Sequence, residues 1–395
     1  MTKIILKKGK EQSLGRFHLW VFSGAIASYE GDSPEDGDIV SVYSSDKKFL
    51  AKGFCGLGSI AVRVITFKDE EIDENWWKAK IEAAYKVRSS ALLSSNQETN
   101  CYRLIHGEGD MIPGLVVDIY DKVAVVQAHC AGIYLNRHKI ASAIKEVMQD
   151  SIVAVYDKSS GTIPPSSELD VVDGYILGES NSKAEVFENG LKFSVNWLDG
   201  QKTGFFLDQR DNRALVRDYA KGRRVLNTFS YTGGFSVYAA KGGAKEVVSV
   251  DSSARAVELS CENMKLNFDE NIAHEGVTID AFNYLKTLEN GRFDLIILDP
   301  PAFAKHIKAQ SNALQGYKRI NANAIRNIAP GGILFTFSCS QAISKEQFRN
   351  AVFSAAAIAG RNVRILHFLS QPCDHPINIY HPESEYLKGL VVYVE

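Results

Sequence analysis

Two residues that can do covalent and acid–base chemistry follow segments with the apolar composition of buried strands. Cys339 lies between two serines just beyond the apolar run 333–337, and Asp299 directly follows the apolar run 293–298. Parallel strands of an open α/β sheet end at one edge, where such sheets bind ligands, so we expect both side chains at that edge. A thiol there favours covalent catalysis, because the thiolate is a strong nucleophile.

The alternative for Cys339 is a structural role, because free cysteine is most often a small buried hydrophobe. Its neighbours Ser338 and Ser340 are polar, whereas a core position would be flanked by apolar residues. We therefore interpret Cys339 as catalytic. The remaining cysteines are interpreted as structural: Cys55, Cys101, Cys130, Cys261 and Cys373.

Length and composition limit the class of protein. The chain has 395 residues, 45% of them hydrophobic, which is ordinary for a globular protein of two or three domains. No apolar run approaches the roughly 20 residues of a membrane span, and the first residues lack the apolar core of a signal peptide. The six cysteines form no C-x-x-C pair, which argues against a zinc cage or a disulfide framework. We expect a cytoplasmic protein without a metal site.

The elements that position these residues are expected in three domains. Residues 1–70 contain short alternating segments between Gly and Asp turns, which predicts a small β-barrel. Residues 71–184 begin with a helix over 73–93 and predict a small α+β domain. Its other expected elements are strands at 115–120, 123–129 and 153–156 and a helix at 135–148. The helix over 73–93 is expected to bury the apolar positions Trp77, Ile81, Ala84, Tyr85 and Val87.

Residues 185–395 predict an α/β domain that starts with a hairpin. Asn189-Gly190 between two alternating segments favours a tight primed turn. Strands and helices then alternate, which predicts a parallel sheet with helices on both faces. The strands are expected at 224–228, 246–251, 277–279, 293–298, 333–337, 363–369 and 390–394, and the helices at 235–240, 254–267, 314–328 and 345–359.

The first three strands of this domain end in residues suited to a nucleoside. Gly233-Gly234 at a strand-to-helix turn lets a ligand approach the backbone, yet the segment matches neither a dinucleotide fingerprint nor a phosphate loop. Asp251 can accept the hydroxyls of a ribose, and Asp280 can accept an adenine amino group. An adenosine that carries positive charge fits this set, which indicates S-adenosylmethionine. Each residue alone also fits a tight turn or a helix N-cap.

Three segments carry sequence motifs: Asn-Thr-Phe-Ser-Tyr-Thr-Gly-Gly-Phe at 227–235, Leu-Asp-Pro-Pro-Ala-Phe at 298–303 and Thr-Phe-Ser-Cys-Ser at 336–340. Together they resemble class I methyltransferase motifs, and in detail those of the bacterial ribosomal RNA large subunit methyltransferase I family. This family methylates carbon 5 of a cytosine in 23S ribosomal RNA. The resemblance implies a Rossmann-like class I methyltransferase domain preceded by a PUA-like barrel and a small α+β domain.

The resemblance extends over nearly the whole chain. Residues 15–26 are similar to the family's RNA-binding PUA domain, 200–210 to the segment before its first strand, and 374–376 and 385–389 to its C-terminal end. We expect S-adenosylmethionine to be bound by residues of the matching segments and by the strand ends at 251–252 and 280–281. These are Thr203, Phe206, Gln209, Arg210, Phe229, Tyr231, Thr232, Gly233, Gly234, Asp251, Ser252, Asp280, Ala281 and Asp299.

The implied reaction needs a nucleophile, because carbon 5 of cytosine is too weak to take a methyl group directly. A thiolate that adds to carbon 6 makes carbon 5 reactive, and we assign this attack to Cys339. Its free pKa of about 8.5 means that the site must favour the anion. Asp299 is expected to hold or transiently protonate ring nitrogen 3. Related enzymes often carry a second cysteine where this chain has Pro301, so water and Asp299 both remain candidates for removing the carbon 5 proton.

The implied partner is 23S ribosomal RNA or a large-subunit assembly intermediate, with no membrane, and a homodimer is left open. Residues 1–16 carry a net charge of +4, which fits phosphate contact but also a solvated terminus. Trp20 and Phe22 are expected in the barrel core. Pro300 should stiffen its loop and Phe303 should stack on an extruded base. The candidates for phosphate contact are Lys7, Lys8, Lys10, Arg16 and His18.

Two other functions compete with this interpretation. The Asp-Pro-Pro-x-Phe segment also resembles the loop of enzymes that methylate a base amino group or guanine without a thiol, and Cys339 is the feature that separates the two. A non-catalytic RNA-binding assembly factor with the same fold would bind RNA regardless of cofactor. In the central domain Arg103, His106 and Glu108 are expected in a Gly-rich loop, where substrate contact and turn formation both stay open.

Overall fold

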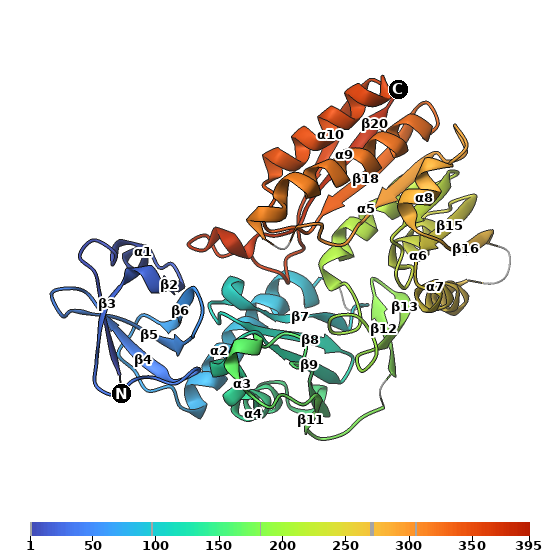
Figure 1. Cartoon of the computed structure of the whole chain (residues 1–395). Coiled ribbons are helices and arrows are strands. Elements are labelled where there is room, and N and C mark those ends of the chain that lie inside the picture. Colours follow the sequence, from blue (N-terminus) through green and yellow to red (C-terminus); the bar gives the residue numbers. More distant parts are fainter. Residues whose placement is uncertain (1, 96–97, 182, 269–271, 305) are drawn as a thin grey trace. The chain divides into compact units, whose positions relative to one another are not determined.

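The computed structural model describes residues 2–95, 98–181, 183–268, 272–304 and 306–395 (Figure 1). The chain divides into two compact units. The N-terminal unit comprises Met1–Asn189, Val195–Leu207 and Cys373–Ser384, and the C-terminal unit comprises Gly190–Ser194, Asp208–Pro372 and Glu385–Glu395. The segment Cys373–Ser384 therefore belongs with residues hundreds of positions earlier, which the sequence pattern does not predict. We also propose the three domains predicted from the sequence, with boundaries near residues 70 and 184.

A six-stranded sheet forms the first part of the N-terminal unit, in the order β2-β6-β5-β4-β1-β3. The β1–β4 pair is parallel and the other pairs are antiparallel. Buried residues such as Ile4, Val42 and Val64 form its apolar core. The strands are β1 Lys3–Leu6, β2 Trp20–Phe22, β3 Ile26–Glu30, β4 Ile39–Tyr43, β5 Phe49–Cys55 and β6 Ile60–Thr66, with the short helix α1 Gln12–Gly15 between β1 and β2.

The expectation that Trp20 and Phe22 lie in this core is wrong. Phe22 is 47% exposed and Trp20 is only partly buried, whereas Val21 between them is buried. Successive side chains of a strand point to opposite faces, so a buried Val21 places both neighbours on the outer face. Strand β2 lies at the edge of the sheet. On the outer face the Trp20 ring lies 4.4 Å from the His381 ring and its Nε1 donates to the Glu108 carboxylate at 3.0 Å, which leaves Trp20 partly buried.

A second sheet, in the order β11-β10-β9-β8-β7, forms the centre of the N-terminal unit. Its strands are β7 Cys101–His106, β8 Leu115–Tyr120, β9 Val123–Ala128, β10 Ala154–Asp157 and β11 Gly174–Leu177, and its helices are α2 Glu74–Arg88, α3 Ala131–Leu135 and α4 Arg137–Met148. Helix α2 begins where the Asp73 carboxylate accepts the Trp76 N–H at 2.8 Å. The expected α+β domain is thus observed.

Two local expectations in this domain are wrong. Val87 is exposed, whereas its neighbour Arg88 is fully buried, with its guanidinium paired to Asp110 and donating to the Asp374 carbonyl at 2.7 Å. Arg103 and His106 lie on strand β7 and not in a loop. The cross-strand partner of Arg103 is Asp118, and their side chains lie 2.6 Å apart, so this charge pair belongs to the sheet. Such long-range pairs are invisible to a local pattern.

The hairpin predicted around Asn189-Gly190 is present. Strand β12 spans Lys183–Glu188 and β13 spans Leu191–Asn196, and the turn residues between them have φ angles of 51° and 75°. Both positive angles are those of a primed turn, which Asn and Gly adopt more readily than other residues.

The C-terminal unit is built on a seven-stranded sheet in the order β16-β15-β14-β17-β18-β20-β19. The first five strands are parallel, as predicted. Strand β20 runs antiparallel to both β18 and β19, so the prediction of a wholly parallel sheet is wrong there. Only a short 3-10 turn, Pro382–Ser384, lies between β19 and β20, and without an α-helical crossover the chain returns antiparallel. The strands are β14 Arg224–Thr228, β15 Glu246–Asp251, β16 His274–Thr278, β17 Leu295–Leu298, β18 Gly332–Ser338, β19 Val363–Leu369 and β20 Lys388–Val394.

Six helices accompany this sheet: α5 Arg210–Ala220, α6 Gly234–Lys241, α7 Ala254–Asn267, α8 Ala281–Lys286, α9 Gln310–Asn327 and α10 Lys345–Ala359. Helices α5 to α7 contact one another in order, as do α8 to α10, and Figure 1 shows α9 and α10 side by side over β18 and β20. Helices α5 and α8 were not predicted. Across the ranges that the structure describes, no helix has the length and apolarity that a membrane span requires.

Candidate active site at the carboxyl edge of the seven-stranded sheet

The carboxyl ends of β17 and β18 carry the predicted acid and thiol. The two strands are adjacent and parallel, with Leu298 opposite Thr336. Asp299 directly follows β17 and Cys339 directly follows β18. Both strands are buried along their length. The two reactive residues therefore leave neighbouring strands at the same edge of the sheet, as the sequence predicts.

The turn that carries Cys339 is fixed by the two serines beside it, both fully buried. The Ser338 hydroxyl donates to the Tyr317 hydroxyl at 2.9 Å, and the Tyr317 and Ser340 hydroxyls lie 2.9 Å apart. The Ala304 N–H donates to the Ser340 hydroxyl at 3.2 Å, which ties the loop after β17 to the turn after β18. Cys339 itself is only partly buried. The thiol thus lies on a turn anchored by buried hydroxyl groups and is itself partly accessible.

The carboxylate of Asp299 is oriented by a chain of amides. Its Oδ1 accepts a hydrogen bond from Gln209 Nε2 at 3.0 Å. The side-chain oxygen of Gln209, Oε1, in turn accepts a hydrogen bond from Asn212 Nδ2 at 2.6 Å. Both amides are buried at the start of α5. Gln209 was predicted as a cofactor residue, and here it contacts the acid. Asn212 was missed, although it lies one helical turn beyond Gln209.

The loop between β14 and α6 has an unusual backbone. Phe229, Tyr231 and Gly233 have φ angles of 55°, 45° and 78°. For aromatic residues this left-handed conformation is strained by about 1–3 kcal/mol each, and such strain clusters at functional sites. A side chain at Gly233 would place its Cβ 2.2 Å from the Ser260 hydroxyl of α7, so only glycine fits. Gly234 is also packed closely, with its Cβ position 3.0 Å from Arg213 Cδ.

Asp251 at the end of β15 holds this loop in place. Its Oδ2 accepts the Tyr231 N–H and its Oδ1 accepts the Ser253 N–H, both at 2.9 Å. Each carboxylate oxygen can accept a second hydrogen bond, so this structural role leaves capacity for ligand hydroxyls. Ser252 beside it is exposed, and Thr232 is buried with its carbonyl accepting from Asn263 at 2.8 Å.

Asp280, after β16, caps helix α8. Its Oδ1 accepts the Asn283 N–H at 2.9 Å, and the residue is exposed, while the following Ala281 is buried. The N-cap role that the sequence left open is therefore observed for Asp280, and its second oxygen can still accept from a ligand.

Aromatic rings run from the strained loop toward the Cys339 turn. The centroid distances are 6.2 Å from Phe229 to Phe282, 5.8 Å from Phe282 to Phe303 and 4.6 Å from Phe303 to Tyr317. Phe303 is partly buried in this row. Pro300, predicted to contact RNA, is buried, whereas Pro301 is exposed.

Other predicted residues are held by contacts with their own neighbours. Thr203 and Phe206 belong to the N-terminal unit, where the buried Thr203 hydroxyl donates to Asp118 Oδ2 at 2.6 Å and Lys202 Nζ lies 4.6 Å from the Phe206 ring centre. Arg210 is buried at the first position of α5, with its Nε 3.4 Å from the carboxylate of Asp211.

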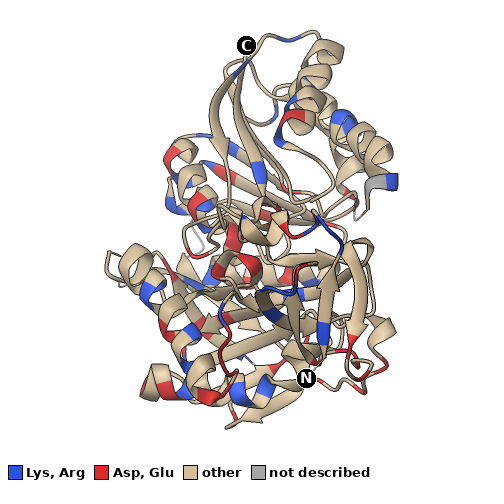
Figure 2. Cartoon of the chain, turned by 90° about the vertical axis from the view of Figure 1, so that its left-hand side faces the viewer, with Lys and Arg blue, Asp and Glu red and all other residues tan. Residues whose placement is uncertain are grey.

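The predicted phosphate contacts are exposed, with one exception. Lys7, Lys8, Lys10 and Arg16 are exposed, whereas His18 is partly buried with its Nε2 3.5 Å from the Glu383 carboxylate. Basic and acidic residues are interspersed along the chain in Figure 2, in keeping with the net charge of −2. In the same domain the side chains of Phe17 and Phe22 are 44% and 47% exposed, although Phe22 was expected in the core.

Lys388 at the start of β20 was missed entirely. It is buried, and its Nζ donates to the carbonyl oxygens of Ser340 and Ile343 at 2.6 and 2.7 Å. The one sequence signal is a lysine inside an otherwise apolar segment that becomes a central strand.

Known protein families and relatives match the chain over most of its length. The model of the S-adenosylmethionine-dependent methyltransferase family matches residues 165–379, and that of the PUA-like domain matches residues 4–67. Ribosomal RNA large subunit methyltransferase I of Aeromonas salmonicida is 42% identical over 394 residues, and that of Erwinia tasmaniensis is 39% identical, each with 98% of both chains covered.

Solved structures show the same architecture. A SAM-dependent methyltransferase from Streptococcus mutans covers 100% of both chains with a TM-score of 0.85 and 25% identity, and a similar structure was determined with SAH bound. The preorganised loop at 229–234 and the carboxylates at 251 and 280 fit S-adenosylmethionine, which is the cofactor of this family. The chain belongs to the ribosomal RNA large subunit methyltransferase I family, with a PUA-like domain near its N-terminus and a class I methyltransferase fold in its C-terminal unit.

Proposed function

We propose that this protein methylates carbon 5 of a cytosine in 23S ribosomal RNA, with Cys339 as the attacking nucleophile. The observation that carries the proposal is the partly exposed thiol on a turn whose flanking serines are fully buried and hydrogen-bonded. A cysteine that served only the core would gain nothing from a polar, accessible turn at the ligand-binding edge of the sheet.

S-adenosylmethionine supplies the electrophilic methyl group when bound. The residues proposed to hold it are those of the strained loop, Asp251 and Asp280, because their backbone and carboxylates match an adenosine with a positive charge. The strain in the loop is offset by its anchoring to Asp251, so the loop does not need to rearrange to bind.

The chain's own residues then act on the base. The Cys339 thiolate adds to carbon 6, which raises electron density at carbon 5 so that carbon 5 can take the methyl group. Loss of the carbon 5 proton and elimination of sulfur then restore the aromatic ring. Asp299 is proposed to bind ring nitrogen 3 as charge develops there, with its orientation set by Gln209. Asp299 and a water molecule are the two candidates for removing the carbon 5 proton.

RNA binding is assigned to the N-terminal domain. Its exposed lysines, Arg16 and the exposed rings of Phe17 and Phe22 combine phosphate contact with stacking, which is the usual way to bind unpaired RNA. Phe303 at the sheet edge is proposed to stack on the target base. The curated relatives carry ribosomal RNA large subunit methyltransferase in their name, which supports this substrate class.

A second candidate is methylation of a base amino group or of guanine, favoured by the Asp299-Pro300-Pro301 loop. That reaction needs no thiol, so Cys339 decides between the two. The test is mass spectrometry of ribosomal RNA from a strain that lacks this gene and is complemented with wild type, Cys339→Ala or Cys373→Ala. Cys373 is an exposed cysteine outside the site and serves as the matched control.

We expect 5-methylcytosine to return with wild type and with Cys373→Ala, and to stay absent with Cys339→Ala. Full methylation by Cys339→Ala would instead support the thiol-independent reaction. If the wild-type complement restores no methylated base to the ribosomal RNA, a non-catalytic binding factor would be favoured.

A further inference from the structure

Lys388 is a buried lysine opposite the residue that precedes Cys339. It begins β20, and its partner across the antiparallel ladder is Ser338 of β18. Only 6% of Lys388 is exposed. Burial of a lysine is unfavourable unless its charge is compensated, so this position calls for a physical reason.

The ammonium group of Lys388 is fastened to the turn that carries the thiol. Its two hydrogen bonds, to the carbonyl oxygens of Ser340 and Ile343, span the turn immediately after Cys339. An ammonium has three N–H groups, so these two carbonyls leave one for an anion at the same turn. The contacts also tie the turn to β20, which limits how far the thiol can move.

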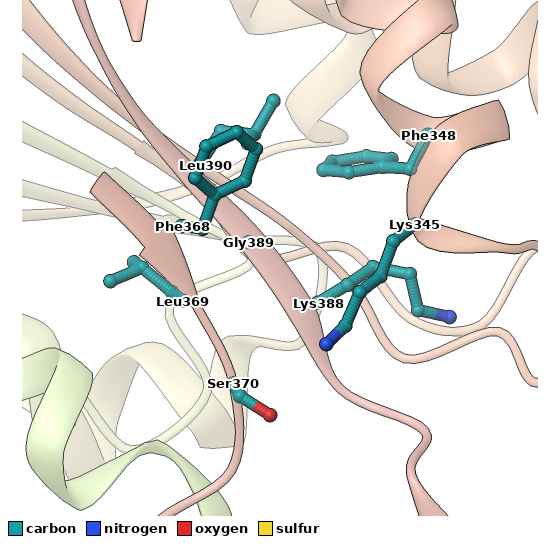
Figure 3. A pocket seen from close by; sticks show the side chains of 8 residues that line it. All are labelled: Lys345, Phe348, Phe368, Leu369, Ser370, Lys388, Gly389 and Leu390. Atoms are coloured by element: carbon teal, nitrogen blue, oxygen red, sulfur yellow. The ribbon is translucent and has the colours of Figure 1, made fainter. Parts of the chain in front are cut away.

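A second lysine offers a built-in comparison. Figure 3 shows Lys345 of α10 and Lys388 of β20 at one cavity of about 230 Å³, with their amines turned to different sides. Lys345 is ion-paired with Glu385, and 59% of its side chain is exposed. The two lysines therefore share a cavity, but only Lys388 is buried against the Cys339 turn.

The electrostatic balance at Lys388 points to Cys339. Burial lowers the pKa of Lys388 to about 8, and Lys345 acts in the same direction. Cys339 and, to a smaller extent, Glu385 act in the opposite direction by favouring the charged amine. Attraction between opposite charges is mutual, so a protonated Lys388 favours the thiolate of Cys339. Tyr317, on the other side of the turn, has its pKa raised by burial and by Cys339.

We propose that Lys388 is a positioning residue that fixes the Cys339 turn and supplies the positive charge that keeps the thiol ionised for attack. The inference rests on the proposed role of Cys339 as nucleophile. The Cys339 proton is lost to solvent before the sulfur adds to the base, and Lys388 keeps its own proton throughout. Lys388 therefore neither attacks nor accepts a proton in this scheme.

The test measures the thiol directly, without RNA or cofactor. The rate of Cys339 alkylation by iodoacetamide is followed against pH in the full-length protein, by mass spectrometry of the peptide that contains Cys339. The variants are Lys388→Gln, which removes the charge but keeps an N–H donor, Lys388→Arg, which keeps the charge, and Lys345→Gln as the matched control.

For Lys388→Gln we expect the midpoint of the alkylation profile to rise by about one pH unit, which is about tenfold slower alkylation at pH 7. Lys388→Arg and Lys345→Gln should stay within about 0.3 unit of wild type, because the charge beside the thiol is unchanged. If circular dichroism shows Lys388→Gln to be unfolded, Lys388→Met takes its place, because its unbranched stem fills the same space without the charge.

A neutral variant that folds and gives the wild-type profile would overturn the inference. So would a Lys388→Arg profile that rises as far as that of Lys388→Gln, because the charge would then not be the cause. Neither result bears on whether Cys339 is the nucleophile, which the ribosomal RNA of the Cys339→Ala strain decides separately.

Discussion

The turn that carries Cys339 and the basic segment at the start of the chain are built in opposite ways. The turn is supported by Ser338, Ser340 and Tyr317, all buried and joined by hydroxyl hydrogen bonds. Lys8, Lys10 and Arg16, by contrast, are exposed in the segments on either side of the short helix α1. The proposed attack by Cys339 therefore depends on a fixed geometry, whereas the proposed contacts of the basic segment with RNA depend on charge and tolerate motion. Changes in the two regions should therefore be distinguishable by what they alter.

The largest effect after loss of the thiol is expected at the acid. Asp299→Asn keeps the size of the side chain but removes the charge, so we expect single-turnover methylation to slow by about 10²–10³-fold with RNA affinity unchanged. Gln209→Ala removes the amide that orients the acid but keeps the acid itself, so the methylation rate should fall about tenfold. Quench-flow methylation assays measure both rates, and an Asp299→Asn rate within twofold of wild type would remove Asp299 from the mechanism.

The two acids at successive strand ends should differ in their effect on the cofactor. Asp251→Ala removes the anchor of the strained loop as well as a ligand contact, so we expect S-adenosylmethionine to bind about 100-fold more weakly. Asp280→Ala removes the N-cap of α8 and one hydrogen bond to the ligand, the latter worth about 1 kcal/mol, and should weaken binding about fivefold. Calorimetric titration gives both constants. The reverse order of the two effects would contradict the assigned roles.

The serine–tyrosine network is expected to contribute more to stability than to binding. Tyr317→Phe leaves the buried Ser338 and Ser340 hydroxyls without their shared partner, so we expect the free energy of unfolding to fall by about 1–2 kcal/mol. The methylation rate should also fall, by the factor that corresponds to about 1–2 kcal/mol, while the affinity for S-adenosylmethionine stays constant. Urea unfolding measures the first quantity, and a variant as stable and as active as wild type would show that the network does not hold the turn.

The smallest effects per residue are expected on the N-terminal surface. Changing Lys7, Lys8 and Lys10 together to Gln should weaken RNA binding at low salt and reduce the slope of log affinity against log salt by up to about three. The methylation rate at saturating RNA should not change. Fluorescence anisotropy at several salt concentrations measures the slope, and a slope equal to that of wild type would exclude these residues from the interface. The control alters three exposed lysines of the C-terminal unit: Lys221, Lys241 and Lys245.

Local patterns predicted the site where the chemistry follows directly from strand ends. Apolar runs located β17 and β18, and a strand that is buried on both faces can be recognised from its composition alone, so Asp299 and Cys339 were placed at one edge. The Asn189-Gly190 hairpin was predictable for the same reason, because its turn chemistry lies within two residues.

Features that depend on distant partners could not be predicted. The direction of β20 is set by its pairing with β18, and the contact of Gln209 with Asp299 joins residues 90 positions apart. Lys388 could not be linked to Cys339, because a lysine in a strand pattern does not reveal which loop it meets. Phe22 was assigned to the core because it is aromatic, although the buried Val21 beside it places it on the outer face.

The measurement that tests the central claim most directly is the trapping of the bond between Cys339 and the base. The probe is a 23S ribosomal RNA transcript in which every cytidine is replaced by 5-fluorocytidine, incubated with the protein and S-adenosylmethionine. Fluorine cannot leave as a proton does, so a sulfur that has added to carbon 6 stays attached. We predict that mass spectrometry finds a methylated fluorocytidine on the peptide containing Cys339, and on no peptide of Cys339→Ala. Efficient methylation of ordinary RNA without any such adduct would contradict the account.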